Sequence, residues 1–129
     1  MATVDTIMSR YLLTVAPSTP LAEAARQMHS RGVGAALVLS GERLSGILTE
    51  RDVLRAVAIG DVEGTNVAAW MTRDPETIER SETRGQAAAL MIRGGFRHLP
   101  VLEGGRAIGI LSIRDLMRVV VDDETPRDE

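Results

Sequence analysis

The chain has 129 residues, 44% of them hydrophobic, and a formal net charge of -3 at pH 7. This acidic balance, together with a single Trp, Tyr and Phe, argues against a nucleic-acid binder, which needs a basic surface or several stacking rings. The absence of cysteine excludes disulfides, thiolate metal ligands and cysteine nucleophiles, and with two histidines we expect no metal site.

Neither a targeting segment nor a membrane span is apparent in the sequence. The N-terminus lacks the basic start and following apolar run of a signal peptide. The longest apolar run, Ala87 to Ile92, falls far below the roughly 20 residues that cross a bilayer. We therefore expect a soluble, cytoplasmic protein that contacts no membrane.

The first half of the chain predicts a short, mixed set of elements. Residues 4–8 favour a helical piece, and Thr14-Val15 a brief extended segment. A helix is expected to start near Pro20, because proline is favoured at the first helical position, and to end at Gly32. A β-hairpin and a last helix follow. The hairpin strands are residues 35–39 and 43–48, around Ser40-Gly41-Glu42, and the helix starts after Thr49.

The second half repeats this order. Residues 4–55 align without a gap on residues 67–118, and 19 of the 52 pairs are identical. The expected elements are a helical piece at 67–71, an extended Thr77-Ile78, a helix ending at Gly95, strands at 98–102 and 106–111, and a helix after Ser112. Two copies at such a long period predict two halves related by a pseudo-twofold axis rather than a solenoid.

The repeat sets the expected domain organisation. We expect a first domain at residues 1–59, a linker at 60–66, a second domain at 67–121 and a loosely ordered charged tail at 122–129. A half of roughly 60 residues buries only a thin core, so the pair is expected to fold as one unit, packed sheet to sheet.

Each half places a hydroxyl and a carboxylate three residues apart where a strand becomes a helix: Thr49 with Asp52, and Ser112 with Asp115. The hydroxyl and the first N–H groups of the helix favour an anion, and the carboxylate can accept hydrogen bonds from a ribose diol. Glycines at 46 and 109 are expected to permit close approach of a nucleoside. The alternative is a helix cap, since Ser or Thr with an acidic residue three positions later resembles a capping box.

The order of motifs resembles the CBS-domain family, named after cystathionine beta-synthase. The resemblance rests on Gly-Ile-Leu-Thr-Glu-Arg-Asp at 46–52, its copy ending at Asp115, and Gly-Phe-Arg-His-Leu-Pro-Val at 95–101. It implies an α/β (α+β) fold of two tandem CBS domains, each β-α-β-β-α, packed through their sheets with pseudo-twofold symmetry. It also implies clefts between the domains that bind AMP, ADP, ATP or related adenosyl ligands.

The resemblance assigns roles to eight residues. Asp52 and Asp115 match ribose-binding aspartates, Thr49 and Ser112 match hydroxyls near ribose and phosphate, Val15 and Ile78 match positions that pack adenine, and Arg97 and His98 match phosphate-contacting residues. The two copies differ at this last position, because the first has Gly34-Ala35 where the second has Arg97-His98. This difference leaves two possibilities. The chain has one competent site, or it has one site that both halves assemble.

The expected function is a non-catalytic regulatory module that binds an adenine nucleotide and needs no other cofactor. IMP dehydrogenase also carries a CBS pair, but its (β/α)8 barrel requires roughly 250 residues, so no enzyme is expected. The alternative is a ligand-free dimerisation or interaction scaffold.

A homodimer is expected because the last helix of each half has an apolar side. These sides are Val53, Leu54 and Val57, and Leu116, Met117 and Val120. An unidentified regulated protein is expected to respond to the ligand.

Overall fold

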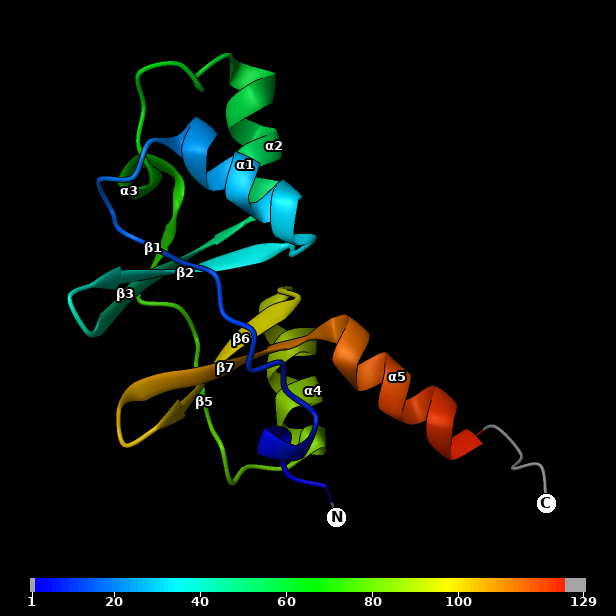
Figure 1. Ribbon diagram of the computed structural model, residues 1–129. Helices are drawn as coiled ribbons and strands as arrows, with labels where there is room; N and C mark the ends of the chain where they lie inside the picture. Colours follow the sequence, from blue (N-terminus) through cyan, green and yellow to red (C-terminus); the bar gives the residue numbers. More distant parts are fainter. Residues whose placement is uncertain (1, 125–129) are drawn as a thin grey trace. The chain divides into compact units, whose positions relative to one another are not determined.

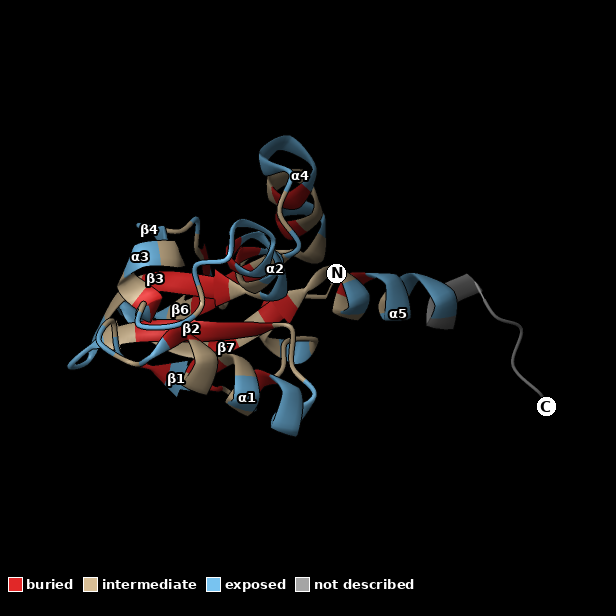
Figure 2. Cartoon of the chain, turned by 90° about the horizontal axis from the view of Figure 1, so that it is seen from above, coloured by how far each residue is buried: buried red, intermediate tan, exposed pale blue. Residues whose placement is uncertain are grey.

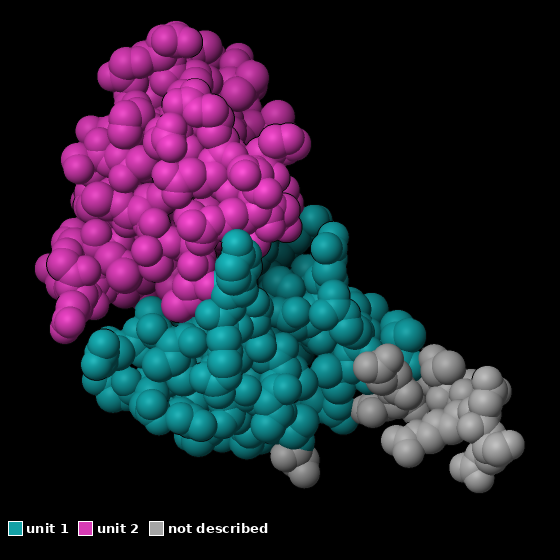
Figure 3. Space-filling view, viewed as in Figure 1, with its two compact units in different colours: residues 1–11, 76–129 teal, residues 12–75 magenta. Residues whose placement is uncertain are grey.

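The computed structural model describes residues 2–124 and divides them into two compact units. Figure 3 colours the two units, one of residues 12–75 and the other of residues 2–11 together with 76–124. These units do not coincide with the two sequence repeats. Each combines the main strands and helices of one repeat with the short segment that precedes the other repeat.

The unit of residues 12–75 holds a four-stranded sheet and the helices of the first repeat (Figure 1). Its elements are β1 (Thr14–Val15), α1 (Leu21–Arg31), β2 (Ala35–Ser40), β3 (Arg43–Thr49), α2 (Glu50–Ile59), α3 (Val67–Trp70) and β4 (Thr72–Arg73). The strand order is β1-β2-β3-β4, with β1 parallel to β2 and the other neighbours antiparallel. Helices α1 and α2 pack together against the sheet.

The second unit repeats this arrangement with three strands. Its elements are the 3-10 helix η1 (Val4–Thr6), β5 (Ile78–Glu79), α4 (Arg84–Gly94), β6 (His98–Glu103), β7 (Arg106–Ser112) and α5 (Ile113–Glu124). The order is β5-β6-β7, with β5 parallel to β6 and β6 antiparallel to β7. The predicted β-α-β-β-α order is thus confirmed in both halves.

Element boundaries differ from the predicted ones by a few residues. Pro20 is the N-cap of α1 rather than its first helical residue. Gly32 and Gly95 end their helices as predicted, with φ of 64° and 68°, a left-handed conformation that glycine adopts at little cost. Helix α5 continues to Glu124, three residues into the predicted tail, and the rest of that tail, 125–129, lies outside the described residues.

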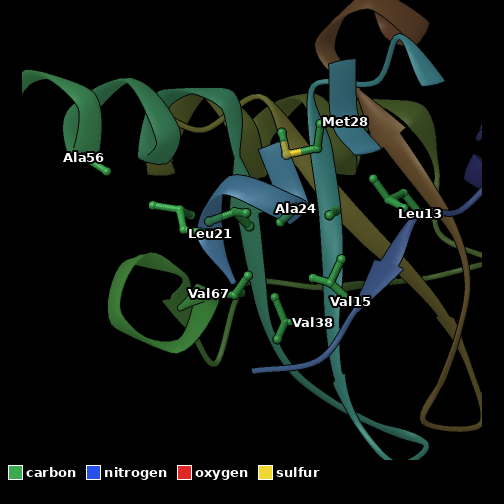
Figure 4. Close-up of a cluster of buried hydrophobic side chains, with 10 residues drawn as sticks. Leu13, Val15, Leu21, Ala24, Met28, Val38, Ala56 and Val67 are labelled. Atoms are coloured by element: carbon green, nitrogen blue, oxygen red, sulfur yellow. The ribbon is translucent and has the colours of Figure 1, made fainter. Parts of the chain in front are cut away.

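Each unit has its own apolar core, seen as the buried strands in Figure 2. In the unit of residues 12–75, α1 contributes Leu21, Ala24 and Met28, whose spacing places them on one face of the helix. Figure 4 shows these side chains together with Val15 and Val38 from neighbouring strands. The second core is a separate cluster of side chains: Val4, Ile78, Ala87, Met91, Leu99, Val101, Leu111 and Leu116. No helix within residues 2–124 is both long enough and apolar enough to cross a membrane.

The segment before each repeat lies along the sheet of the other repeat. Thr72 pairs with Ile47, and Ser9 forms the equivalent bridge with Ile110. A Cβ added at Gly46 would lie 2.8 Å from the Thr72 carbonyl oxygen and 2.8 Å from the Met71 sulfur. The expectation that this glycine admits a nucleoside is therefore wrong, because the space beside it is taken by the exchanged segment. A Cβ added at Gly109 would lie 3.0 Å from the Ser9 carbonyl oxygen.

Candidate ligand-binding motifs

The Thr49–Asp52 motif lies where β3 ends and α2 begins. The Asp52 Oδ2 accepts hydrogen bonds from the Thr49 backbone N–H at 2.9 Å and from the Thr49 hydroxyl at 3.1 Å. The Asp52 N–H donates in return to the Thr49 hydroxyl oxygen at 3.4 Å, which completes a capping box. The capping alternative is therefore confirmed as the structural role of this pair.

The Ser112–Asp115 motif has the same geometry at the junction of β7 and α5. The Ser112 N–H donates to Asp115 Oδ2 at 2.8 Å, and the Asp115 N–H donates to the Ser112 hydroxyl at 3.1 Å. Reciprocal bonds of this kind satisfy backbone groups that a helix start leaves unpaired, so both motifs stabilise their helices.

One carboxylate oxygen of each aspartate is not used by its cap. No group within residues 2–121 donates a hydrogen bond to Oδ1 of Asp52 or Asp115, and the nearest cation is an arginine one turn along the helix. Arg55 Nη1 lies 4.0 Å from Oδ1 of Asp52, and Arg118 Nη1 lies 4.0 Å from Oδ1 of Asp115. Each motif therefore keeps one carboxylate oxygen that accepts no hydrogen bond from residues 2–121.

Burial distinguishes the two aspartates from an ordinary helix cap. Asp52 is 6% exposed and is the one charged residue classed as buried within residues 2–121. The Asp115 side chain is 16% exposed. Within residues 2–121 no buried side-chain nitrogen or oxygen lacks a hydrogen-bond partner, so the unpaired Oδ1 of each aspartate reaches solvent.

Arg97 and His98 lie at the same end of their sheet as the Ser112–Asp115 motif. His98 is the cross-strand partner of Ser112, and the Arg97 carbonyl accepts a hydrogen bond of 2.8 Å from the Ile113 N–H. The structure therefore joins Arg97 and His98 with Ser112 and Asp115 within one unit.

The matching positions in the other unit carry no basic group. Ala35 pairs with Thr49, and the Gly34 carbonyl accepts from the Glu50 N–H at 3.0 Å. The backbone pairing at this position is equivalent in both units, so they differ here in their side chains.

Val15 and Ile78 belong to the cores rather than to these strand ends. Val15 pairs with Val38 in the middle of β2 and is 8% exposed, and Ile78 pairs with Val101 and is 5% exposed. Their side chains pack among the apolar residues of their own units.

Two arginines beside the aspartates were not among the site residues expected from the sequence. Arg55 and Arg118 are identical in the two copies and follow Asp52 and Asp115 by three residues, so their position in the repeat was the available signal. Within residues 2–121 no group of three or more His, Cys, Asp or Glu side chains is arranged to hold a metal ion.

Comparison with known sequences places both repeats in one family. The family described as CBS domain matches residues 4–59 and 66–122. The chain belongs to the CBS-domain family. Its CBS fold is shared with a protein with CBS domains from Burkholderia ambifaria MC40-6, which is 34% identical with a TM-score of 0.90 over 99% of this chain and 100% of that one.

Further CBS relatives differ in length and in what they carry. The "Uncharacterized 17.7 kDa protein in bps2 3'region" of Acidianus ambivalens is 36% identical over 97% of this chain and 77% of its own length. The solved structure of CBSX2 in complex with AMP is 25% identical, with a TM-score of 0.85 over 97% of this chain and 100% of that one. This CBS pair matches 23% of the length of an inosine-5'-monophosphate dehydrogenase from Korarchaeum cryptofilum, at 33% identity, so that enzyme is a different and much longer protein.

Proposed function

We propose that this CBS pair is a non-catalytic regulatory module that binds AMP, ADP, ATP or a related adenosyl ligand. The observation that carries the proposal is the Oδ1 of Asp52 and Asp115, to which no group within residues 2–121 donates, because an unpaired carboxylate oxygen at a helix start suits a ribose hydroxyl. Membership of the CBS family and the AMP complex of CBSX2 support the ligand class.

The roles proposed for the other residues follow their positions. Thr49 and Ser112 present hydroxyls and helix N-terminal amides near ribose and phosphate, where an anion is favoured. Arg97 and His98 add positive charge or hydrogen bonding beside Ser112. Val15 and Ile78, whose side chains are buried, contribute backbone groups and an apolar edge to adenine.

The two units are proposed to bind ligands with different charge. The end of the sheet that carries Arg97 suits a phosphorylated nucleoside, and the end that carries Gly34 suits a ligand with less negative charge. We expect one nucleotide to bind tightly per chain, and titration calorimetry measures this stoichiometry.

Titration calorimetry with AMP, ADP, ATP and S-adenosylmethionine tests the proposal, with GTP as the base control. Binding of at least one adenosyl compound is expected. In thermal unfolding, that compound at about 100 times its dissociation constant should raise the free energy of unfolding by about 2.7 kcal/mol. If no adenosyl compound binds the folded protein, the scaffold alternative replaces this proposal.

A homodimer is part of the proposal. Val53 and Leu116 pack into the cores, so the apolar sides expected from the sequence are partly covered. Leu54 and Met117 nevertheless stay exposed on α2 and α5, at 67% and 53%. Such residues suit burial against a second copy, and a regulated protein would then respond to the ligand-bound form.

A further inference from the structure

The N-terminal segment is attached differently from its counterpart in the other repeat. Residues 67 and 68 are held on the first repeat by backbone bonds, Val67 N–H to the Thr19 carbonyl and Ala68 N–H to the Pro17 carbonyl, both 2.9 Å. The equivalent bonds of the N-terminal segment are Val4 N–H to Glu82 at 2.8 Å and Asp5 N–H to Arg80 at 3.2 Å. The two attachments share these backbone hydrogen bonds. They differ in their side chains and in how each segment pairs with the edge strand.

The N-terminal attachment has a weaker strand edge. Segment 72–73 forms strand β4 and pairs with β3 at two positions, Gly46 with Arg73 and Ile47 with Thr72. Ser9 pairs with Ile110 in a single isolated bridge, with mutual hydrogen bonds of 2.8 and 2.9 Å. The N-terminal segment therefore pairs with β7 at one position, whereas residues 72–73 pair with β3 at two.

Ionic side chains add to the N-terminal attachment. Arg80 Nη2 lies 2.9 Å from Asp5 Oδ2, and Arg80 Nη1 lies 2.5 Å from Glu103 Oε2. The Thr3 hydroxyl donates to the other oxygen of Asp5. The matching positions at the other attachment are Ala68, Pro17 and Ser40, which cannot form ion pairs.

We propose that Asp5, Arg80 and Glu103 form an electrostatic clasp that closes the N-terminal segment over the edge of β7. Val4, fully buried in the core, holds the segment by apolar contacts, and the clasp sets how often the whole segment, Val4 included, detaches from the unit. Opening frees the Ile110 N–H and carbonyl, two residues before Ser112. The clasp therefore makes the end of β7 that carries Ser112 sensitive to ionic strength and leaves the equivalent end of β3 insensitive.

Amide hydrogen exchange measured by NMR on the full chain tests the clasp, because the repeat supplies matched controls. The reporters are the amides of Val4 and Ile110, and their controls are the amides of Val67 and Ile47. In Asp5→Asn and Arg80→Gln, protection of Val4 and Ile110 should fall about two- to fivefold, the range expected for partly exposed ion pairs. Protection of Val67 and Ile47 should stay unchanged.

Salt gives a second, independent readout on the unaltered protein. Raising NaCl from 0.05 to 0.5 M should lower protection at Val4 and Ile110, and Asp5→Asn should remove that salt dependence. Arg26→Gln, which breaks the exposed Arg26–Glu23 pair on α1, is the matched charge control and should leave all four amides unchanged.

Two outcomes overturn the clasp. The first is unchanged protection at Val4 and Ile110 in both variants. The second is an equal loss at the Leu99–Leu111 pair in the middle of the β6–β7 ladder, which would mean that the ion pairs stabilise the whole unit rather than control its edge. Neither outcome depends on nucleotide binding, so the test stands apart from the proposed function.

Discussion

His98 lies directly across the β6–β7 ladder from Ser112, and the equivalent pair in the other unit is Ala35 and Thr49. Two equivalent strand pairs thus end in different chemistry, one with an imidazole across from the hydroxyl residue and one with a methyl group. Together with Arg97 this makes the two motifs unequal toward a charged ligand, and several measurements follow from the difference.

Removing the charge of each aspartate should weaken adenosyl binding unequally. A charge-assisted hydrogen bond from a ribose hydroxyl to Oδ1 is worth about 1.5–3 kcal/mol, so Asp→Asn at a fully used site should cost tenfold or more in affinity. Calorimetry on Asp52→Asn, Asp115→Asn and the double variant measures this. A double variant that folds and binds AMP and ATP as tightly as the parent shows that these aspartates do not hold the ribose.

The caps predict a separate stability effect for the alanine variants. Asp52→Ala and Asp115→Ala remove the acceptor for the Thr49 or Ser112 N–H and should lower the free energy of unfolding by about 0.5–2 kcal/mol. Urea unfolding followed by circular dichroism measures the loss. Asp→Asn keeps an acceptor oxygen and should lose less, which separates capping from ligand binding.

Arg97→Gln should change the preference between ligands rather than the binding of adenosine itself. Loss of its positive charge should weaken AMP and ATP more than adenosine, and the effect should shrink as salt is raised. Arg93→Gln, an exposed arginine on α4 that donates to the Ala89 carbonyl, is the matched control. Equal weakening of adenosine and ATP in Arg97→Gln would show that Arg97 does not contact phosphate.

Gly46→Ala should destabilise the unit of residues 12–75. Its new methyl group meets the Thr72 carbonyl oxygen, which is backbone and moves only with the exchanged segment, so a loss of about 1–3 kcal/mol is expected. Gly85 lies on helix α4, and a Cβ added there meets only the Thr83 hydroxyl oxygen, at 3.8 Å. Gly85→Ala should therefore be neutral or slightly stabilising. Trp70 packs against the core of this unit and reports its unfolding by fluorescence. A Gly46→Ala protein as stable as Gly85→Ala would contradict the close packing of residues 71–72.

Light scattering across a dilution series tests the homodimer. Leu54→Lys and Met117→Lys should shift the mass toward the monomer, because each places a charge in the proposed apolar interface. Ile92→Lys, at a position on α4 that is 79% exposed and outside these helices, should leave the mass unchanged. A parent protein that is monomeric at tens of micromolar rules out the homodimer.

The Asp5 carboxyl should titrate at a lower pH than an ordinary aspartate. Hydrogen bonds from Thr3 and then Arg80 lower its pKa, and Arg80 itself also faces Glu103. The pKa of Asp5 is lower in the folded than in the unfolded state. The contribution of its charge to the free energy of unfolding is therefore complete above about pH 4 and is lost as pH falls through the folded pKa. Carboxyl-carbon NMR titration of the parent and of Arg80→Gln measures the shift. An unchanged midpoint in Arg80→Gln would show that Arg80 does not stabilise the charged form.

The sequence by itself determined the elements and the family. The gapless repeat, the glycines after α1 and α4 and the apolar runs around Gly41 and Gly104–Gly105 are local signals, because helix ends and hairpin turns depend on neighbouring residues. The same pattern located Thr49, Asp52, Ser112 and Asp115. It could not choose between a cap and a ligand group, because both need a hydroxyl and a carboxylate at the same spacing.

Only the tertiary structure decided which segments belong together. Gly46 was expected to face a nucleoside, and it faces Met71 and Thr72, which come from the segment before the second repeat. Sequence adjacency placed residues 4–8 with the first domain, whereas buried Val4 packs in the core of the other unit. Contacts between residues far apart along the chain are fixed by packing and edge pairing, and these have no signature in a local pattern.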